Sequence, residues 1–325
     1  MTVPGVALAV LLTVFLATAC SSSAPGATLV TRIAGCVGVH TLTYSGAPGA
    51  QPAAATQCVP EASLITAADA TAPQASSSSM QPGASTATAT REIPTVGKLT
   101  FLVDGVLSLS CTATVIDGTA AKNSEELIVT AAHCLEGTFD GITYTSTHLL
   151  FSPMWHDGKN PFGTWTVKKA FLSKGWLTRK PHGVDCKTNP LDDYAVVVLN
   201  PKNGKGVGDL TGADGWAVNQ PKTIDRVTIA GIPSTSPGTL VTTINTRTVT
   251  ESGEPYRQAA TPGFTDGTSG GPWLRDFSTK TNRGVLIGDT GGFEQGGPSS
   301  GTPSYANDWT GGFAALVKAA VSFEG

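Results

Sequence analysis

Leu127-Ile128-Val129-Thr130-Ala131-Ala132-His133-Cys134 joins a run of β-forming residues to a short turn that ends in a histidine and a cysteine. Small residues after the run let a strand turn tightly and present the imidazole of His133. Because an imidazole exchanges a proton near neutral pH, His133 is a candidate general base. A histidine in a loop is more often structural, so this stretch needs partners elsewhere in the chain.

Two further stretches offer such partners. In Asp192-Asp193-Tyr194-Ala195-Val196-Val197-Val198-Leu199, a carboxylate precedes an apolar strand, where it can be buried only if a donor such as an imidazole N–H satisfies it. In Gly267-Thr268-Ser269-Gly270-Gly271-Pro272-Trp273, glycines allow a tight turn that presents Ser269 and aims backbone N–H groups at one point. Each stretch alone could be an ordinary turn, but the three together favour nucleophilic catalysis.

Composition indicates an all-β protein. The chain has 325 residues, 38 of them glycine, and only 14% are charged, with a formal net charge of −3. That charge excludes a strongly basic nucleic-acid binder, and no apolar run reaches the roughly 20 residues of a membrane span. A helical period of apolar residues is confined to the C-terminal end, after Gly311. The β-rich runs are residues 99–103, 127–130, 194–199, 227–230 and 239–250.

The N-terminal region predicts export. Val6–Ala19 is uncharged and apolar, as in the core of a signal peptide, and is too short to span a bilayer. The residues before Cys20 resemble a bacterial lipobox, which would make Cys20 a lipidated first residue; an ordinary cleaved signal is the alternative. Residues 21–94 are rich in Ala, Ser, Thr and Pro, and predict a mostly disordered pro-segment or linker, within which Leu29–Tyr44 could form a hairpin.

The contexts of His133, Asp193 and Ser269, in this order, resemble those of the chymotrypsin-like (trypsin-fold) serine peptidases, most closely the bacterial secreted branch. The resemblance covers about residues 95–323. It implies two packed antiparallel β-barrels with a C-terminal α-helix: barrel 1 at about 95–205, barrel 2 at about 206–310 and the helix at about 312–322. The expected domains are therefore a signal peptide over 1–20, a linker over 21–94 and a peptidase domain over 95–325.

The resemblance also assigns roles. His133 would be the general base, Asp193 would orient it, and Ser269 would be the nucleophile. The backbone N–H groups of Gly267 and Ser269 would form the oxyanion hole. Gly263, six residues before the nucleophile, and Phe264 would line the specificity pocket, which argues against a strong preference for Arg or Lys.

Two acidic residues and one strand complete the expected specificity region. Asp266 and Asp289 could lie at the pocket rim, although solvated loop acids are the commoner case. Residues 284–292 are expected to contain the edge strand that pairs with an extended peptide. Thr268 stands where the animal enzymes have an aspartate that pairs with a new N-terminus, so we expect local hydrogen bonds to hold the turn instead.

The cysteines suit an oxidising compartment. Cys111 and Cys134 match the disulfide that pins the histidine loop in this family. Cys36, Cys58 and Cys186 leave three pairings open: Cys36–Cys58, Cys58–Cys186 or Cys36–Cys186. The remaining histidines have no metal-ligand spacing, so no metal and no cofactor are expected; they are His40, His148, His156 and His182.

These observations predict an extracellular serine endopeptidase, secreted or lipid-anchored at the outer face of the cell membrane. The expected partner is a protein or peptide substrate, with no nucleic acid, with membrane contact only through a lipid anchor, and with a monomeric chain. One alternative is a non-catalytic cell-surface binding module on the same fold. Another is an esterase-type hydrolase.

Overall fold

The computed structural model describes residues 36–47, 50–60, 88–118, 126–139, 142–177, 180–182, 185–187, 189–221 and 223–323. All of them belong to one unit of the chain, residues 31–325. The predicted signal peptide, Cys20 and residues 21–35, 48–49 and 61–87 of the predicted linker lie outside the described residues, and with them the first part of the predicted Leu29–Tyr44 hairpin. Within these ranges, no helix is long and apolar enough to cross a membrane.

The first half of the fold is a closed barrel. Its strands follow the order β13-β6-β5-β4-β9-β10, and β13 pairs with both β6 and β10, which closes the ring. Side chains alternate between the interior and the outer face along β4, as expected for a barrel wall. The strands are β4 (Val96–Val103), β5 (Leu107–Val115), β6 (Leu127–Thr130), β9 (Thr147–Pro153), β10 (Trp165–Ser173) and β13 (Ala195–Leu199).

A hairpin extends this barrel beyond its predicted start. Strands β1 (Cys36–Thr43) and β2 (Ala53–Pro60) pair with each other, and β1 also pairs with β10. A disulfide joins Cys36 to Cys58 across the hairpin, with the Cα atoms 5.7 Å apart, which excludes the two pairings of these cysteines with Cys186. The prediction of a mostly disordered segment is therefore wrong for both strands. Strand β1 buries Val39 and Leu42 in the core, whereas nearly all of β2 is exposed and is held by backbone pairing, the disulfide and the buried Val59.

The second half consists of two sheets. The larger has the order β14-β20-β19-β15-β16-β3, and the smaller β17-β18-β21; a bridge between Thr290 and Ala306 links them. Strand β3 pairs with β16, so after the β1–β2 hairpin the chain pairs with this half before it forms β4 of the first barrel. The strands are β3 (Ala89–Thr90), β14 (Gly215–Trp216), β15 (Val227–Gly231), β16 (Leu240–Ile244), β17 (Arg247–Glu251), β18 (Glu254–Ala259), β19 (Pro272–Ser278), β20 (Arg283–Asp289) and β21 (Ser304–Ala306).

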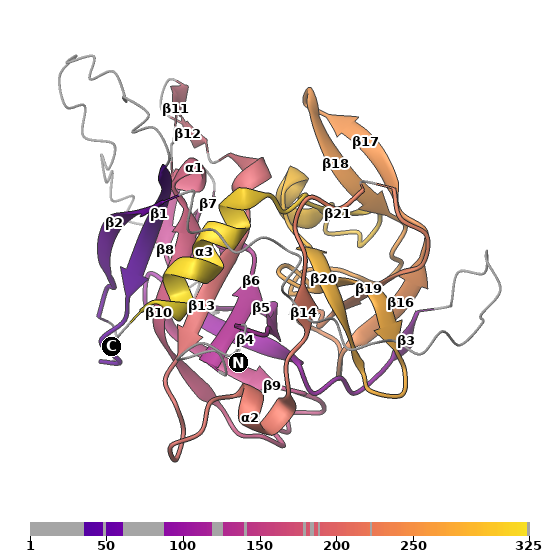
Figure 1. The fold of residues 1–325 in the computed structure, drawn as a ribbon, viewed down its shortest axis with the longest axis horizontal. Coiled ribbons are helices and arrows are strands. Elements are labelled where there is room, and N and C mark those ends of the chain that lie inside the picture. Colours follow the sequence, from indigo (N-terminus) through magenta and orange to yellow (C-terminus); the bar gives the residue numbers. More distant parts are fainter. Residues whose placement is uncertain are drawn as a thin grey trace, which may run out of the picture. The chain divides into compact units, whose positions relative to one another are not determined.

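The predicted C-terminal helix is confirmed as α3 (Gly311–Val321), which begins at Thr310, where the side-chain oxygen accepts from the Gly312 N–H. The helix packs on β1, β10 and β13 (Figure 1). Phe313 is fully buried and stacks on Trp309, with ring centroids 3.7 Å apart. The all-β class with a C-terminal helix is thus confirmed.

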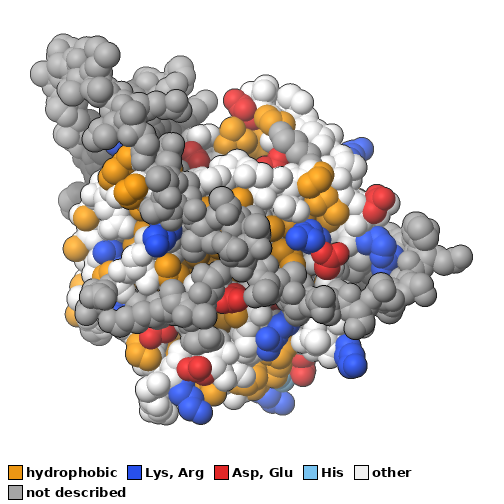
Figure 2. Space-filling model, viewed as in Figure 1, with side chains coloured by type: hydrophobic (Ala, Val, Ile, Leu, Met, Phe, Trp, Pro, Cys, Tyr) orange, Lys and Arg blue, Asp and Glu red, His pale blue; other side chains and the backbone are white. Residues whose placement is uncertain are grey.

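The remaining elements are short and lie in the connections. They are η3 (Ala132–Cys134), β7 (Glu136–Phe139), β8 (Ile142–Thr145), α1 (Lys174–Leu177), β11 (Lys180–His182), β12 (Asp185–Lys187), η4 (Pro190–Asp192), α2 (Gly208–Thr211) and η5 (Phe293–Gly296). On the face seen in Figure 2, the charged side chains of the described residues are scattered, with both signs mixed.

Candidate active site

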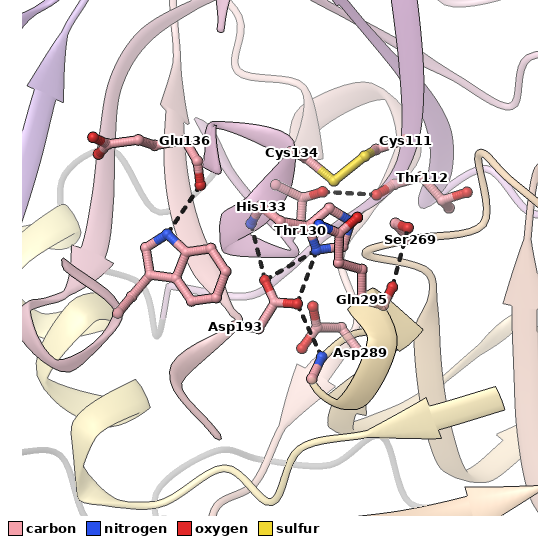
Figure 3. A network of polar contacts seen from close by, with 12 residues as sticks. Cys111, Thr112, Thr130, His133, Cys134, Glu136, Asp193, Ser269, Asp289 and Gln295 are labelled. Atoms are coloured by element: carbon pink, nitrogen blue, oxygen red, sulfur yellow. Dashed lines mark hydrogen bonds and ion pairs between the residues drawn. A yellow bond between two sulfur atoms is a disulfide. The ribbon is translucent and has the colours of Figure 1, made fainter. Parts of the chain in front are cut away.

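His133 and Asp193 lie against each other at the end of the first barrel. The Nδ1 atom of His133 is 2.8 Å from Asp193 Oδ2 and 3.1 Å from Oδ1 (Figure 3). His133 follows β6 on the short helix η3, and Asp193 lies between η4 and β13, which pairs with β6. Strand pairing therefore brings together two residues that are 60 positions apart in the chain.

The surroundings of Asp193 stabilise its charged form. Its carboxylate accepts from the backbone N–H of His133 at 2.9 Å and from that of Gly292 at 2.9 Å. Asp193 is fully buried and His133 is 5% exposed. With Nδ1–H directed at the carboxylate, the imidazole keeps Nε2 free of a proton in its neutral form. This is the tautomer that a general base needs.

Asp192, the neighbouring acid, has different partners. Its carboxylate accepts from the Asn189 side chain at 2.9 Å and from the Tyr194 hydroxyl at 3.2 Å. Burial raises the pKa of Asp192, although these hydrogen bonds oppose the shift. The structure therefore places Asp193 rather than Asp192 beside His133.

A disulfide and two side-chain hydrogen bonds hold the loop that carries His133. A disulfide joins Cys111 of β5 to Cys134, with the Cα atoms 6.3 Å apart. The Tyr144 hydroxyl donates to the His133 carbonyl at 2.7 Å, and the Ser146 hydroxyl donates to the Cys134 carbonyl at 2.8 Å. Burial and the charge of Asp193 raise the pKa of Tyr144 to about 12, so this hydroxyl remains a donor at neutral pH. Sequence reasoning missed Tyr144 and Ser146, since neither belongs to a recognisable motif.

The turn around Ser269 is fixed by local bonds and by the first barrel. The Thr268 side chain donates to the Thr265 carbonyl at 2.9 Å, and the Gly271 N–H donates to the Thr268 carbonyl at 2.9 Å. Thr112 of β5 donates its backbone N–H to the Ser269 carbonyl at 2.8 Å. The expected local hydrogen bonds around Thr268 are therefore present.

The side chain of Thr112 adds two more bonds. Its hydroxyl donates to the Gly267 carbonyl at 2.9 Å and accepts from the Ile232 N–H at 2.8 Å, and the residue is fully buried. Gly267 has φ +99°, and a Cβ there would lie 2.6 Å from the Ser234 nitrogen and 2.8 Å from the Ile232 oxygen. Glycine is therefore required at this position by both its backbone angle and its close packing.

The backbone N–H groups of Gly267 and Ser269 are available to a ligand. Neither donates to another group within the described part of the chain. Two such N–H groups on one tight turn can both bind an oxygen that develops negative charge. The structure thus keeps the two predicted oxyanion donors together and unpaired.

The hydroxyl of Ser269 has a different partner from the one expected for a base-activated nucleophile. It donates to the Gln295 carbonyl at 3.5 Å, a long hydrogen bond. Between the described residues Ser269 and His133 the structure contains no hydrogen bond; Figure 3 marks the Ser269 bond to Gln295 and the His133 bonds to Asp193. The two loops nevertheless approach each other, because a Cβ at Gly270 would lie 2.8 Å from the Ala131 nitrogen. Gln295 belongs to η5, where Glu294 and Gln295 have φ of 49° and 57°.

Of the residues predicted to determine specificity, some are exposed and others are buried in the core. Gly263 is exposed at φ +87°, whereas Phe264 is 3% exposed and packs into the core of the second half. Asp266 is exposed, but Asp289 is fully buried and cannot lie at a pocket rim. Strand β20 pairs with β19 and, at Val285 and Leu286, with β14, so the prediction of an edge strand is contradicted at those two residues and stays a prediction for the rest of 284–292.

Among the described residues, one group of side chains has the spacing of metal ligands, namely Cys111, His133 and Cys134, whose ligand atoms lie within 4.8 Å of one another. The two sulfur atoms are joined in the disulfide, so neither is a thiolate that could bind a metal. This group therefore does not fit a metal site.

Comparisons with known proteins agree with this architecture. No family model and no curated protein matches the sequence. A protease, Anisep, from Arthrobacter nicotinovorans has a similar structure, with a TM-score of 0.57 and 23% identity over 73% of this chain and 100% of that chain. The thermostable serine protease AL20 from an extremophilic microorganism has a TM-score of 0.57 and 22% identity over 71% and 98%. A Glu endopeptidase has a TM-score of 0.51 and 15% identity over 73% and 97%. At these identities the similarity shows a shared fold.

Proposed function

From the chymotrypsin-like serine peptidase fold that the chain has, we propose that it is an exported serine endopeptidase. The observation that carries the proposal is the pair of His133 and Asp193, with Nδ1 2.8 Å from the carboxylate, beside a turn that presents Ser269 and two unpaired N–H groups. Nothing in a structural role requires all of these groups at one place. Peptide hydrolysis uses every one of them.

The proposed reaction begins when Ser269 Oγ attacks the carbonyl carbon of a peptide bond. His133 Nε2 takes the hydroxyl proton, and the charge on the imidazolium is balanced by Asp193. The carbonyl oxygen, now negative, accepts from the N–H groups of Gly267 and Ser269. His133 then gives its proton to the leaving amine, and water releases the acyl group by the same steps in reverse.

The hydroxyl of Ser269 must turn from the Gln295 carbonyl to His133 for this chemistry. A rotation about one side-chain bond is enough to redirect a serine hydroxyl, and the bond to Gln295 is long at 3.5 Å. Catalytic hydrogen bonds are often poorly aligned before substrate binds. The same contact supports the competing proposal of a non-catalytic binding module, in which the hydroxyl would keep its bond to Gln295.

Export is part of the proposal. Two disulfides, Cys36–Cys58 and Cys111–Cys134, suit an oxidising compartment outside the cytoplasm. The signal-like N-terminus agrees with this location, either as a secreted chain or as one anchored through a lipid on Cys20. The substrate would then be an extracellular protein or peptide.

Labelling with a fluorophosphonate probe tests the proposal. The chain should include residues from Cys36 onward, because β1, β2 and β3 pair with the two halves of the fold. We expect covalent labelling at Ser269, found by peptide mapping and abolished in Ser269→Ala. Ser45→Ala, at an exposed serine beyond β1, is the matched control and should label like the wild type. Folded protein that fails to label would support the binding module.

A further inference from the structure

A cluster of buried polar side chains lies behind Asp193, and the proposed mechanism does not use it. Asp289 at the end of β20 and Asn307 after β21 are both fully buried. The antiparallel bridge between Thr290 and Ala306 sets them opposite each other. Asp289 Oδ2 and both amide atoms of Asn307 have no hydrogen-bond partner among the described residues. Since buried polar atoms are almost always paired, this cluster requires an explanation.

Asp289 lies beside Asp193 (Figure 3). Two neighbouring carboxyl groups in a buried site do not both ionise, because their charges repel each other in a medium of low dielectric constant. Asp193 accepts from the imidazole and from the N–H groups of His133 and Gly292, whereas Asp289 Oδ1 accepts from the Trp309 indole at 3.1 Å. Donors stabilise the charged form, so the negative charge belongs on Asp193 and the proton on Asp289.

The electrostatic surroundings agree with this assignment. Burial, and then the charge of Asp193, raise the pKa of Asp289 well above its ordinary value. Tyr194 is the other titratable group that interacts with Asp289, and the raised pKa of its phenol keeps it neutral. The buried cation of β18, Arg257, pairs with Asp308 at 3.1 Å.

The end of β20 and the residues just after it bond both the Ser269 turn and Asp193. Thr290, directly after Asp289, accepts from the Gly270 N–H at 2.7 Å and donates to the Gly271 carbonyl at 2.8 Å, next to Ser269. Two residues further on, the Gly292 N–H donates to Asp193. Asp289 ties this strand end to Trp309, which stacks on Phe313 of α3. A shift of the strand end would therefore move the Ser269 turn and Asp193 together.

We propose that Asp289 is a positioning residue that acts as a neutral carboxylic acid: it fixes the strand end that holds Asp193 and the Ser269 turn, and it leaves the negative charge on Asp193. The inference rests on the proposed function. An ionised Asp289 would add a second negative charge near the imidazole, which would favour its protonated form and remove the base. A neutral Asp289 supplies the same hydrogen-bond acceptor without that charge.

Infrared difference spectroscopy tests the neutral state without reference to activity. The spectrum of wild-type protein minus that of Asp289→Asn at pH 7 should contain the carbonyl stretch of a protonated carboxylic acid. Asp276→Asn, at an exposed acid within β19, is the control and should lack this band. A carboxylate band in place of the acid band would overturn the proposal.

Kinetics test the positioning role. Asp289→Asn should keep kcat within about threefold, and the midpoint of the acidic limb of its kcat/KM profile should not move, because one neutral group replaces another. Asp289→Ala should lower kcat about tenfold or more at a similar KM. A fall of the Asp289→Asn midpoint by about one pH unit would mean that a charge had been removed, and would refute the proposal. Equal losses in both variants would also refute it.

Two further measurements apply if Asp289→Ala does not fold or if the wild type does not label at Ser269. If Asp289→Ala does not fold, Trp309→Phe removes the indole donor and keeps the ring; we expect a severalfold lower kcat, and an unchanged kcat overturns the proposal. If the wild type does not label at Ser269, the proposed function fails. The proton resonance of His133 Nδ1 then decides the positioning role: it should persist in Asp289→Asn and be lost or shifted in Asp289→Ala, and an unaffected signal in Asp289→Ala would overturn it.

Discussion

Replacing Thr112 with valine tests how the turn around Ser269 is held. Valine has nearly the same shape but no hydroxyl, so the Gly267 carbonyl and the Ile232 N–H each lose their partner in a fully buried place. An orphaned buried group costs about 1–3 kcal/mol, so two of them should lower the free energy of unfolding by about 2–6 kcal/mol. Gly267, whose carbonyl loses its partner, also supplies one proposed oxyanion donor through its own N–H, so we expect labelling of Ser269 to slow by about tenfold to a hundredfold.

Thr114→Val is the matched control for this experiment. Thr114 lies on the same strand and is also fully buried, but its hydroxyl has no partner among the described residues. Its replacement should change the free energy of unfolding by less than about 0.5 kcal/mol, or should stabilise the fold. Urea unfolding and the labelling rate are the two readouts. If Thr112→Val and Thr114→Val behave alike, the bonds of Thr112 do not hold the turn.

Three other changes test separate parts of the structure. Asp193→Asn should lower kcat/KM by about 10⁴ without unfolding the chain, because an amide favours the wrong imidazole tautomer; a loss below tenfold would contradict the proposed role. Cys111→Ala with Cys134→Ala opens a bridge of sequence separation 23 and should lower the free energy of unfolding by about 3 kcal/mol, measured in urea; no change would argue that the bridge is dispensable. Burial raises the pKa of Asp214 from 3.8 to about 7, so the folded state binds this proton more tightly than the unfolded state. The stability from this proton is fully present below about pH 4 and is lost as pH rises through about 7. Asp214→Asn should flatten the dependence of unfolding free energy on pH in that window, and an equally steep dependence would refute the assignment.

The three motifs could be read from the sequence because each depends on its own neighbours. Small residues before His133, an apolar strand after Asp193 and glycines around Ser269 are local requirements of a turn or a strand end. The structure adds what joins them: β6 pairs with β13, which brings His133 to Asp193, and Thr112 of β5 bonds the Ser269 turn. That pairing follows from the strand order of the closed barrel, which cannot be predicted from any single stretch of the sequence.

Other features could not be predicted because they depend on contacts between distant residues. Strand β2 lacks an apolar face, so its composition is typical of a linker, and its order comes from pairing with β1 and from Cys36–Cys58. In the sequence, Asp289 cannot be distinguished from a surface acid, because Trp309 and Asp193 become its neighbours only in the folded chain. The role of Thr112 depends on partners that lie more than 100 positions away in the chain.

The contact between Thr112 and the Ser269 turn also has a consequence for the order of assembly. The hydroxyl of Thr112 bonds a carbonyl 155 residues further along the chain, so this bond forms only when both halves of the fold have met. Contacts of such long sequence separation form late in folding, because the loop between them must close first. A half-folded chain therefore has no finished turn around Ser269. In a peptidase, this dependence would keep the nascent chain inert until both halves of the fold have met.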